Sequence, residues 1–133
     1  MSGHHRTIHV RSQLREELID VSDLVVRTIA EIGRDDGLVT VFSPHTTAAM
    51  TINENADPDV QADLVAWLGR LVPQNDGFRH AEGNSDAHIK ASLVGPSIQV
   101  PLVGGRLLLG RWQGIYFCEF DGPRLRRVEV VVN

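Results

Sequence analysis

The sequence predicts a single α+β domain, with a mostly antiparallel sheet or sandwich and two helices. The first half of the chain holds two segments whose apolar residues recur at helical spacing, each next to short strand-like runs. From residue 87 onward, short apolar runs alternate with turns rich in Gly and Pro, which is typical of antiparallel strands. The 133 residues, 42% of them hydrophobic, suit one domain with its own core.

The first elements are a strand, a short partner strand and a helix. Apolar and polar residues alternate over Thr7–Leu14, which predicts a strand, and Glu17–Val21 is its candidate partner. Ser22 is the expected N-cap of a helix that ends at Gly33. Residues 1–6 are expected to form a flexible tail.

Two further strands and a second helix follow. The apolar run Leu38–Phe42 predicts a buried strand, and Ala48–Ile52 a second short strand. Asp57 and Pro58 are expected at the N-cap and first position of a helix that ends near Pro73. Trp67 is expected to lie in the core, because it shares one face of this helix with other apolar residues: Val60, Leu64, Leu68 and Leu71.

The remainder of the chain is predicted to be a long loop followed by strands. Gln74–Asp86 contains turn residues and little apolar material, and loops of this length in small domains are often functional. Turn residues separate five candidate strands: His88–Val94, Ser97–Pro101, Arg106–Leu109, Gly114–Phe120 and Arg126–Val132.

Composition limits the classes of partner. A net charge of −4 and a pI near 5.8 argue against a nucleic-acid-binding protein, which usually carries a basic face. No apolar run approaches the roughly 18 residues of a membrane span, and none resembles a signal peptide, so we expect a cytoplasmic protein that does not bind membranes. Cys118 is the only cysteine, which excludes an internal disulfide, and a buried inert thiol is expected.

Two polar stretches, residues 39–55 and 80–92, are expected to meet and build one site. They contribute His45, His80 and His88. Three neutral imidazoles that converge in space would make an open metal site, for which zinc is the natural ion. The spacing matches no dedicated zinc motif, so surface or hydrogen-bonded histidines are the alternative interpretation.

A carboxylate and an arginine are the next candidates. Glu119 ends an apolar strand face, where it is an acid or base, a partner for a ligating histidine, or an ordinary residue at the sheet rim. Arg124 follows the turn Asp121-Gly122-Pro123, where its guanidinium could clamp a phosphate.

Neutral polar side chains supplement this candidate anion site. Thr46, Thr47 and Asn84 offer hydrogen-bond donors, and Gln113 lies in a turn beside Trp112. Further candidates are Asn53 and Glu54, which could instead cap local backbone. Neither a P-loop nor a GxGxxG motif is present, so nucleotide binding by those devices is not supported.

The chain resembles the YjbQ-like family over nearly its whole length. The resemblance rests on several motifs: HTTAA at 45–49, INE at 52–54, DP at 57–58, LVP at 71–73, His80, AH at 87–88, ASLVG at 91–95, VP at 100–101, Gly110, WQGI at 112–115 and EFDGPR at 119–124. Arg111 is a departure, because the family usually has a threonine before the Trp-Gln pair. This change adds a positive charge near the expected rim of the pocket.

The resemblance implies a fold with a β-sandwich core and two helices, a homotrimer, and a polar site near the subunit contacts. It also implies that His45, His80 and His88 are metal or anion ligands. Members of this family are described as secondary thiamine-phosphate synthases, which join hydroxymethylpyrimidine diphosphate to thiazole phosphate and release pyrophosphate.

The sequence is therefore compatible with three functions. The first is a metal-dependent enzyme, either this transferase or a hydrolase, in which His45, His88 and Glu119 are catalytic. Pyrophosphate chemistry usually recruits magnesium through carboxylates, whereas three imidazoles favour zinc, so a divalent metal, zinc before magnesium, is expected. The second is a trimeric module that binds a small phosphorylated molecule or a metal without catalysis. The third is a polar cluster that only fixes the trimer interface.

Overall fold

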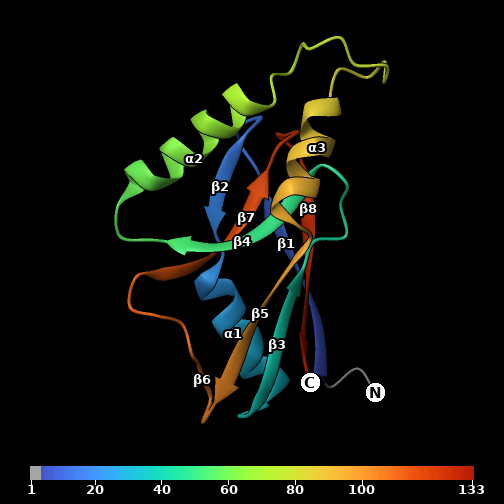
Figure 1. The fold of residues 1–133 in the computed structure, drawn as a ribbon. Helices are drawn as coiled ribbons and strands as arrows, with labels where there is room; N and C mark the ends of the chain where they lie inside the picture. Colours follow the sequence, from blue (N-terminus) through green and yellow to red (C-terminus); the bar gives the residue numbers. More distant parts are fainter. Residues whose placement is uncertain (1–3) are drawn as a thin grey trace.

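The structure is a computed structural model that describes residues 4–133, which form eight strands and three helices (Figure 1). One antiparallel sheet has the order β1-β8-β3-β5-β6, and a second has the order β2-β7-β4. The strands are β1 (His5–Arg11), β2 (Glu17–Asp20), β3 (Gly37–Phe42), β4 (Ala48–Glu54), β5 (Ser97–Val103), β6 (Arg106–Leu107), β7 (Gln113–Glu119) and β8 (Leu125–Val132). The helices are α1 (Ser22–Ile32), α2 (Pro58–Leu71) and α3 (Ser85–Val94).

The two sheets pack face to face and enclose the main core, which confirms the α+β class and the antiparallel sandwich. Inward residues of the larger sheet, such as Val41 and Val130, meet Met50 and Phe117 of the smaller sheet in one buried cluster. α1 completes this layer with Val25. The other face of the smaller sheet carries a second, smaller cluster, in which Ala49, Cys118 and Phe120 contact α3.

Local sequence signals correctly place two of the helices. α1 ends at Gly33, which adopts a left-handed conformation with φ of 80°. Ser22 differs from its expected capping role: it is the first helical residue, and its Oγ accepts the N–H of Ile115. At α2 the Asp57 carboxylate caps the helix by accepting the N–H of Asp59, and Pro58 follows as the first residue.

The strand predicted over His88–Val94 is wrong, because residues 85–94 form α3. The alternation of polar and apolar residues in this segment is typical of a strand. Its buried residues are Asp86, Ala87, Lys90 and Ala91, which lie one and four residues apart on one helical face. Two of them are charged, so hydropathy alone does not reveal that face. The domain consequently has three helices where two were predicted.

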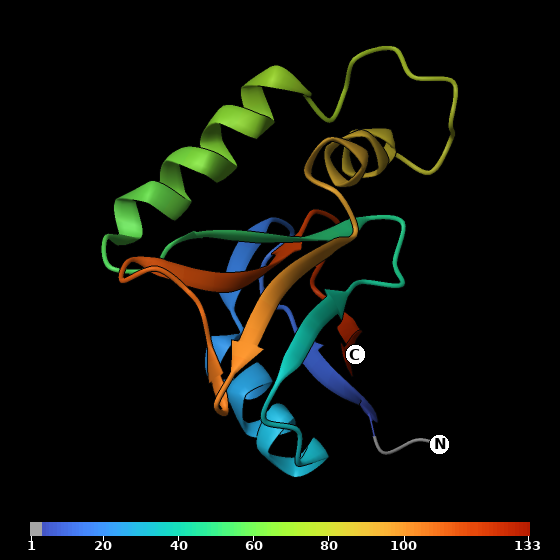
Figure 2. The ribbon, with the colours of Figure 1, turned by 60° about the horizontal axis from the view of Figure 1, so that its bottom comes forward.

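The prediction that Trp67 of α2 lies in the core is also wrong. Every residue of α2 is exposed or half-buried, and Trp67 exposes 62% of its surface. Figure 2 shows α2 lying on the outside of the smaller sheet rather than within the sandwich. The helix therefore presents apolar side chains on the outside of the chain.

Residues 5–11 join the larger sheet, and the single thiol of the chain is buried. The tail predicted over residues 1–6 falls partly outside the described residues, but His5 and Arg6 belong to β1. Cys118 is buried, and burial raises the pKa of its thiol to about 12. Within residues 4–133, none of the three helices is both long and apolar enough to cross a membrane.

Candidate functional site

A polar cavity of about 500 Å³ opens at the end of the sandwich where β3 and β7 finish and β8 begins. Its wall on the sheet side comes from the β3–β4 connection and the turn into β8. The opposite wall comes from the loop between α2 and α3 and from α3 itself. The lining residues are Pro44, His45, Thr46, Thr47, His80, Glu82, Asn84, His88, Asp121, Arg124 and Arg126.

The three histidines of the sequence prediction line this one cavity. His45 comes from the sheet side, whereas His80 and His88 come from the loop and from α3. The rings of His80 and His88 meet edge to face, with their centroids 5.5 Å apart. Nε2 of His80 also lies 3.8 Å from Oε1 of Glu82. Parts of two polar stretches, residues 39–55 and 80–92, thus line one cavity.

The end of β3 positions His45. Pro44 follows the last strand residues, and the buried hydroxyl of Ser43 accepts the backbone N–H of His45 at 3.4 Å. The ring lies edge-on to Phe117, and its Nε2 accepts the backbone N–H of Arg127 at 3.0 Å. Burial and, second, the positive charge of Arg126 lower the pKa of His45, so its neutral form is favoured.

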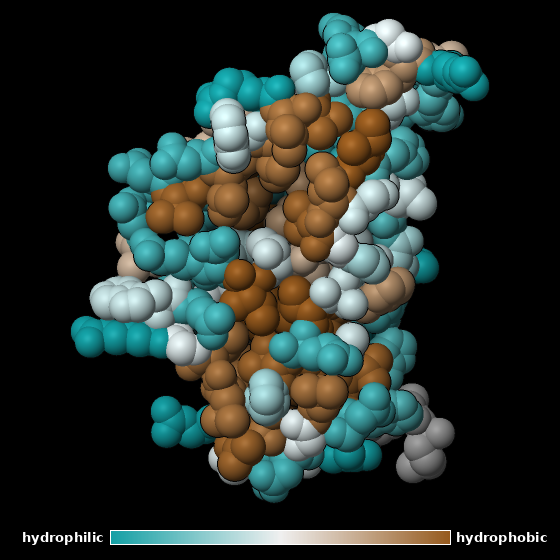
Figure 3. Space-filling model, viewed as in Figure 1, coloured by the Kyte–Doolittle hydropathy of each residue, from teal (hydrophilic) through white to brown (hydrophobic). Residues whose placement is uncertain are grey.

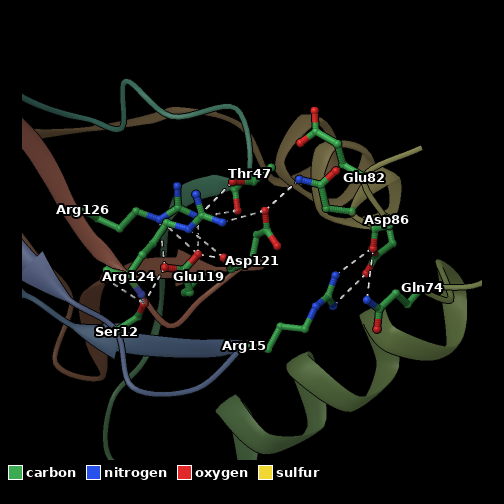
Figure 4. A network of polar contacts seen from close by, with 12 residues as sticks. Ser12, Arg15, Thr47, Gln74, Glu82, Asp86, Glu119, Asp121, Arg124 and Arg126 are labelled. Carbon is green, nitrogen blue, oxygen red and sulfur yellow. Dashed lines mark hydrogen bonds and ion pairs between the residues drawn. The ribbon is translucent and has the colours of Figure 1, made fainter. Parts of the chain in front are cut away.

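Behind the cavity, Arg126 and Glu119 form a buried ion pair (Figure 4). Nε of Arg126 donates to Oε1 of Glu119 at 2.9 Å, and Nη2 donates to Oε2 of Glu119 and, at 2.9 Å, to Oγ1 of Thr47. Ser12 donates its hydroxyl to Glu119 at 2.6 Å. The guanidinium therefore has a fixed position, with only Nη1 lacking an acceptor among the described residues.

Glu119 acts here as an anchor for Arg126. Burial by itself would raise the pKa of this carboxyl, but the hydrogen bonds from Arg126, Ser12 and the N–H of Asp121 outweigh it and lower the pKa. The side chain is fully buried and lies behind the cavity lining. A stabilised, fully bonded carboxylate is poorly suited to accept or release a proton.

A second arginine is held at the rim by the turn between β7 and β8. Nε of Arg124 donates to the backbone oxygen of Asp121 at 2.9 Å, and Nη2 donates to its carboxylate at 3.2 Å. The same carboxylate accepts Nδ2 of Asn84 at 2.8 Å, which ties the loop before α3 to the sheet. Arg124 is exposed, and its Nη1 has no acceptor among the described residues.

A buried cluster of charges holds α3 in place (Figure 4). Arg15, from the β1–β2 connection, donates two hydrogen bonds to the fully buried Asp86, at 3.0 and 3.1 Å. Lys90, one helical turn further on, bonds Asp86 at 3.0 Å and also contacts Glu16. Burial opposes ionisation of Asp86, but the bonds from Arg15 and Lys90 prevail and lower its pKa. This cluster fixes the helix that carries His88.

Other predicted site residues lie elsewhere. Asn53, Glu54 and Gln113 are at the far end of the β4–β7 pair, where Glu54 is opposite Gln113 and six residues from Ala48. Six residues of strand span about 20 Å. There the Oδ1 of Asn53 caps the N–H of Glu54, and Gln113 accepts the N–H of Gly110. Arg111 stacks on the Trp112 ring at this end, so the expectation that it lies at the pocket rim is wrong.

The histidines as placed do not fit a metal ion. Nε2 of His45 is already occupied by the Arg127 N–H. Across residues 4–133, no three His, Cys, Asp or Glu side chains are grouped so that they could hold one. The described arrangement is richer in hydrogen-bond donors than in metal ligands.

Sequence reasoning missed three charged lining residues: Arg126, Asp121 and Glu82. Arg126 could have been found, because it continues the inward-facing series Val128, Val130 and Val132 of β8 at period two. An arginine on the core face of a strand requires a buried acid, and Glu119 is the matching residue on β7.

Comparisons with known proteins identify relatives over almost the whole chain. The family model described as UPF0047 protein YjbQ-like matches residues 6–133. The chain is 50% identical to UPF0047 protein MJ1081 of Methanocaldococcus jannaschii, over 92% of this chain and 89% of that protein. It is 48% identical to UPF0047 protein YugU of Bacillus subtilis, over 91% and 92% respectively.

Solved structures share the fold. A YjbQ/UPF0047 protein of Clostridium acetobutylicum, described as uncharacterised, superposes with a TM-score of 0.94 at 48% identity, over 96% of this chain and 99% of that one. The hypothetical protein APE1520 of Aeropyrum pernix gives a TM-score of 0.93 at 36% identity, over 97% of each chain.

Proposed function

The chain belongs to the YjbQ-like UPF0047 family, and we propose that its histidine-lined cavity binds a small phosphorylated molecule. The supporting observation is the pair of anchored guanidinium groups at one cavity. Arg124 is held by Asp121 and Arg126 by Glu119, and each retains an Nη1 that no described residue occupies. Guanidinium groups fixed in advance lose little conformational entropy when they bind an oxyanion.

The neutral lining suits the same ligand. Thr46 contributes an exposed hydroxyl, and His45, His80 and His88 contribute ring nitrogens. The two acids nearest the arginines already form ion pairs with them, Asp121 with Arg124 and Glu119 with Arg126. A phosphate can accept several charge-assisted hydrogen bonds at once, each worth about 1.5–3 kcal/mol.

Calorimetric titration of the purified protein with inorganic phosphate, pyrophosphate and simple phosphate monoesters tests the proposal. Arg124→Met removes one donor without disturbing the buried pair, and it should weaken binding about 10- to 100-fold. Arg27→Met on α1 is the matched control, because Arg27 is an exposed arginine remote from the cavity lining. Equal phosphate affinities for the wild type and Arg124→Met would overturn the proposal.

Catalysis of the thiamine-phosphate synthase reaction is the specific enzymatic version. A leaving pyrophosphate develops negative charge, which Arg124 and Arg126 could neutralise. His88 is the candidate acid or base, because Glu119 is committed to Arg126. Purified protein is mixed with both thiamine precursors, and thiamine phosphate is measured. Product no greater than that of a His88→Ala control would exclude this version.

A zinc ion in this site remains a prediction. Elemental analysis of protein purified without chelator tests it directly. Near-stoichiometric zinc that is lost in His88→Ala would support the prediction and would require His45 to move from Arg127. Metal content unaffected by the substitution would contradict it.

A non-catalytic binding module is the alternative within the same proposal. Such a protein gains melting temperature with phosphates, because ligand binds only the folded state, but converts no substrate. Melting temperatures of His45→Ala, His80→Ala and His88→Ala, measured with and without phosphate, distinguish a binding site from a cluster that only stabilises the trimer. Variants that bind phosphate normally but no longer assemble would favour the structural function.

The proposal includes a homotrimer, for which α2 provides a suitable surface. Trp67 and Leu71 of α2 and Leu93 of α3 each expose about 60% of their surface, and Figure 3 shows apolar side chains exposed along this side. Large contiguous apolar patches are typical of interaction surfaces. Light scattering should give three times the chain mass for the wild type and a smaller mass for Trp67→Lys. A monomeric wild type would contradict the trimer.

A further inference from the structure

The hydrogen bond to the ring of His45 determines which of its two nitrogens carries a proton. A backbone N–H can donate only to a nitrogen that keeps its lone pair, and the Arg127 N–H donates to Nε2 at 3.0 Å. Nε2 therefore bears no proton. In a neutral imidazole the proton then resides on Nδ1, which makes that nitrogen a hydrogen-bond donor.

The fold fixes this contact. β3 and β8 pair as far as Phe42 opposite Glu129, and β3 ends there. Arg127 is two residues from Glu129, so its N–H points to the same side of β8, where β3 no longer offers a carbonyl. The chain turns at Ser43 and Pro44, and the His45 ring takes the position of the missing acceptor.

The surrounding charges disfavour a histidinium at this position. The positive charges of Arg126 and Arg127 of β8 act on the ring, and the buried carboxylate of Glu119 on β7 opposes them. That carboxylate is already shared with Arg126 and Ser12. Glu82 and Asp121 line the same cavity, but Asp121 is paired with Arg124. Protonation of Nε2 would also place two N–H groups against each other.

We propose that His45 is a neutral hydrogen-bond donor, which presents Nδ1–H to an oxyanion of the bound ligand and does not act as a proton acceptor or a histidinium. The donor role rests on the proposed function, because it requires a bound phosphate. The tautomer of His45 follows from the Arg127 contact alone. Any proton transfer in the cavity then falls to His80 and His88, which contact each other.

Nitrogen NMR of histidine-labelled protein tests the tautomer without any ligand. Two-bond proton–nitrogen correlations distinguish a protonated from an unprotonated ring nitrogen, and His45→Gln identifies the His45 signals by their loss. We expect Nδ1 to be protonated and Nε2 to be unprotonated at neutral pH, because the Arg127 N–H donates to Nε2. A proton on Nε2 at neutral pH overturns the inference.

Two substitutions test the donor role toward phosphate. Asn places its amide nitrogen near the position of Nδ1, whereas Gln places its carbonyl oxygen near that of Nε2. His45→Asn should keep phosphate affinity within about threefold of the wild type, and His45→Gln should lose about tenfold while keeping the Arg127 contact and the melting temperature.

The outcomes separate the two proposals. Unchanged phosphate affinity in His45→Gln overturns the donor role alone, because the wild type still binds. A wild type that binds no phosphate overturns the proposed function and the donor role together, and the NMR result then decides whether the tautomer is fixed.

Discussion

Loss of the guanidinium at position 126 should destabilise the protein strongly. Arg126→Met leaves the Glu119 carboxylate fully buried, with hydrogen bonds only from Ser12 and the N–H of Asp121. Removing one partner of a buried ion pair typically costs about 3–5 kcal/mol. The two remaining bonds, worth roughly 1 kcal/mol each, place the expected loss near the lower end, at about 3 kcal/mol.

Urea denaturation at neutral pH measures this loss. Arg127→Met is the matched control, because Arg127 is the adjacent exposed arginine, whose side chain pairs with Glu129. It keeps the backbone N–H that binds His45 and should change the unfolding free energy by no more than about 1 kcal/mol. The double variant Glu119→Gln/Arg126→Met should recover part of the loss, because no uncompensated charge stays buried.

The pH dependence has a defined sign. The folded-state pKa of Glu119 is lowered from 4.5, so its contribution to stability is fully present above that pH and is lost as the pH falls through the folded value. In Arg126→Met the carboxyl protonates at a higher pH than in the wild type, so the difference in unfolding free energy between variant and wild type should narrow as the pH falls from the folded-state pKa of the variant toward that of the wild type. A loss under about 1 kcal/mol at neutral pH, or one equal to that of Arg127→Met, would refute the reasoning.

Three further outcomes follow from burial and close contacts. Lys90→Met removes one of two cations from the buried Asp86 and should cost about 3 kcal/mol in urea denaturation, whereas a cost near zero would contradict the role of this cluster. Gly122→Ala should destabilise by about 1–3 kcal/mol, because its Cβ would clash with the backbone oxygen of Leu14. The control Gly69→Ala, with open space in α2, should stabilise by about 0.5–1 kcal/mol, and equal melting temperatures of the two variants would exclude the clash. Cys118, whose thiol pKa is raised to about 12, should resist thiol reagents at about pH 8 until the protein unfolds, and rapid modification of the native protein would show that the thiol is accessible.

Local sequence signals were sufficient for much of the fold. Asp57 and Pro58 marked the start of α2, and Gly33 marked the end of α1, because capping and left-handed glycine are determined by neighbouring residues. Alternation at period two identified β8. The three histidines line one cavity: His45 follows β3, His80 lies in the α2–α3 loop and His88 lies in the first turn of α3.

The errors came from interactions that a local pattern does not contain. α3 was predicted as a strand because its buried face includes Asp86 and Lys90, whose burial depends on Arg15 and Glu16 some seventy residues away. Trp67 was placed in the core because helical spacing shows that residues share a face but not what covers it. The register of β4 with β7 is equally non-local, and it moves Glu54 to the end opposite His45.

The two walls of the cavity come from parts of the chain that differ in how well they tolerate substitution. The arginine wall is built into strand ends, where a substitution disturbs buried charge and the sandwich together. The facing wall comes largely from residues 73–84, an exposed connection whose internal bonds include that from Gln74 to the Gly83 carbonyl. Replacing residues 73–84 by the corresponding segment of a relative should therefore change which molecules enter the cavity. The two arginines that are proposed to bind phosphate would keep their positions.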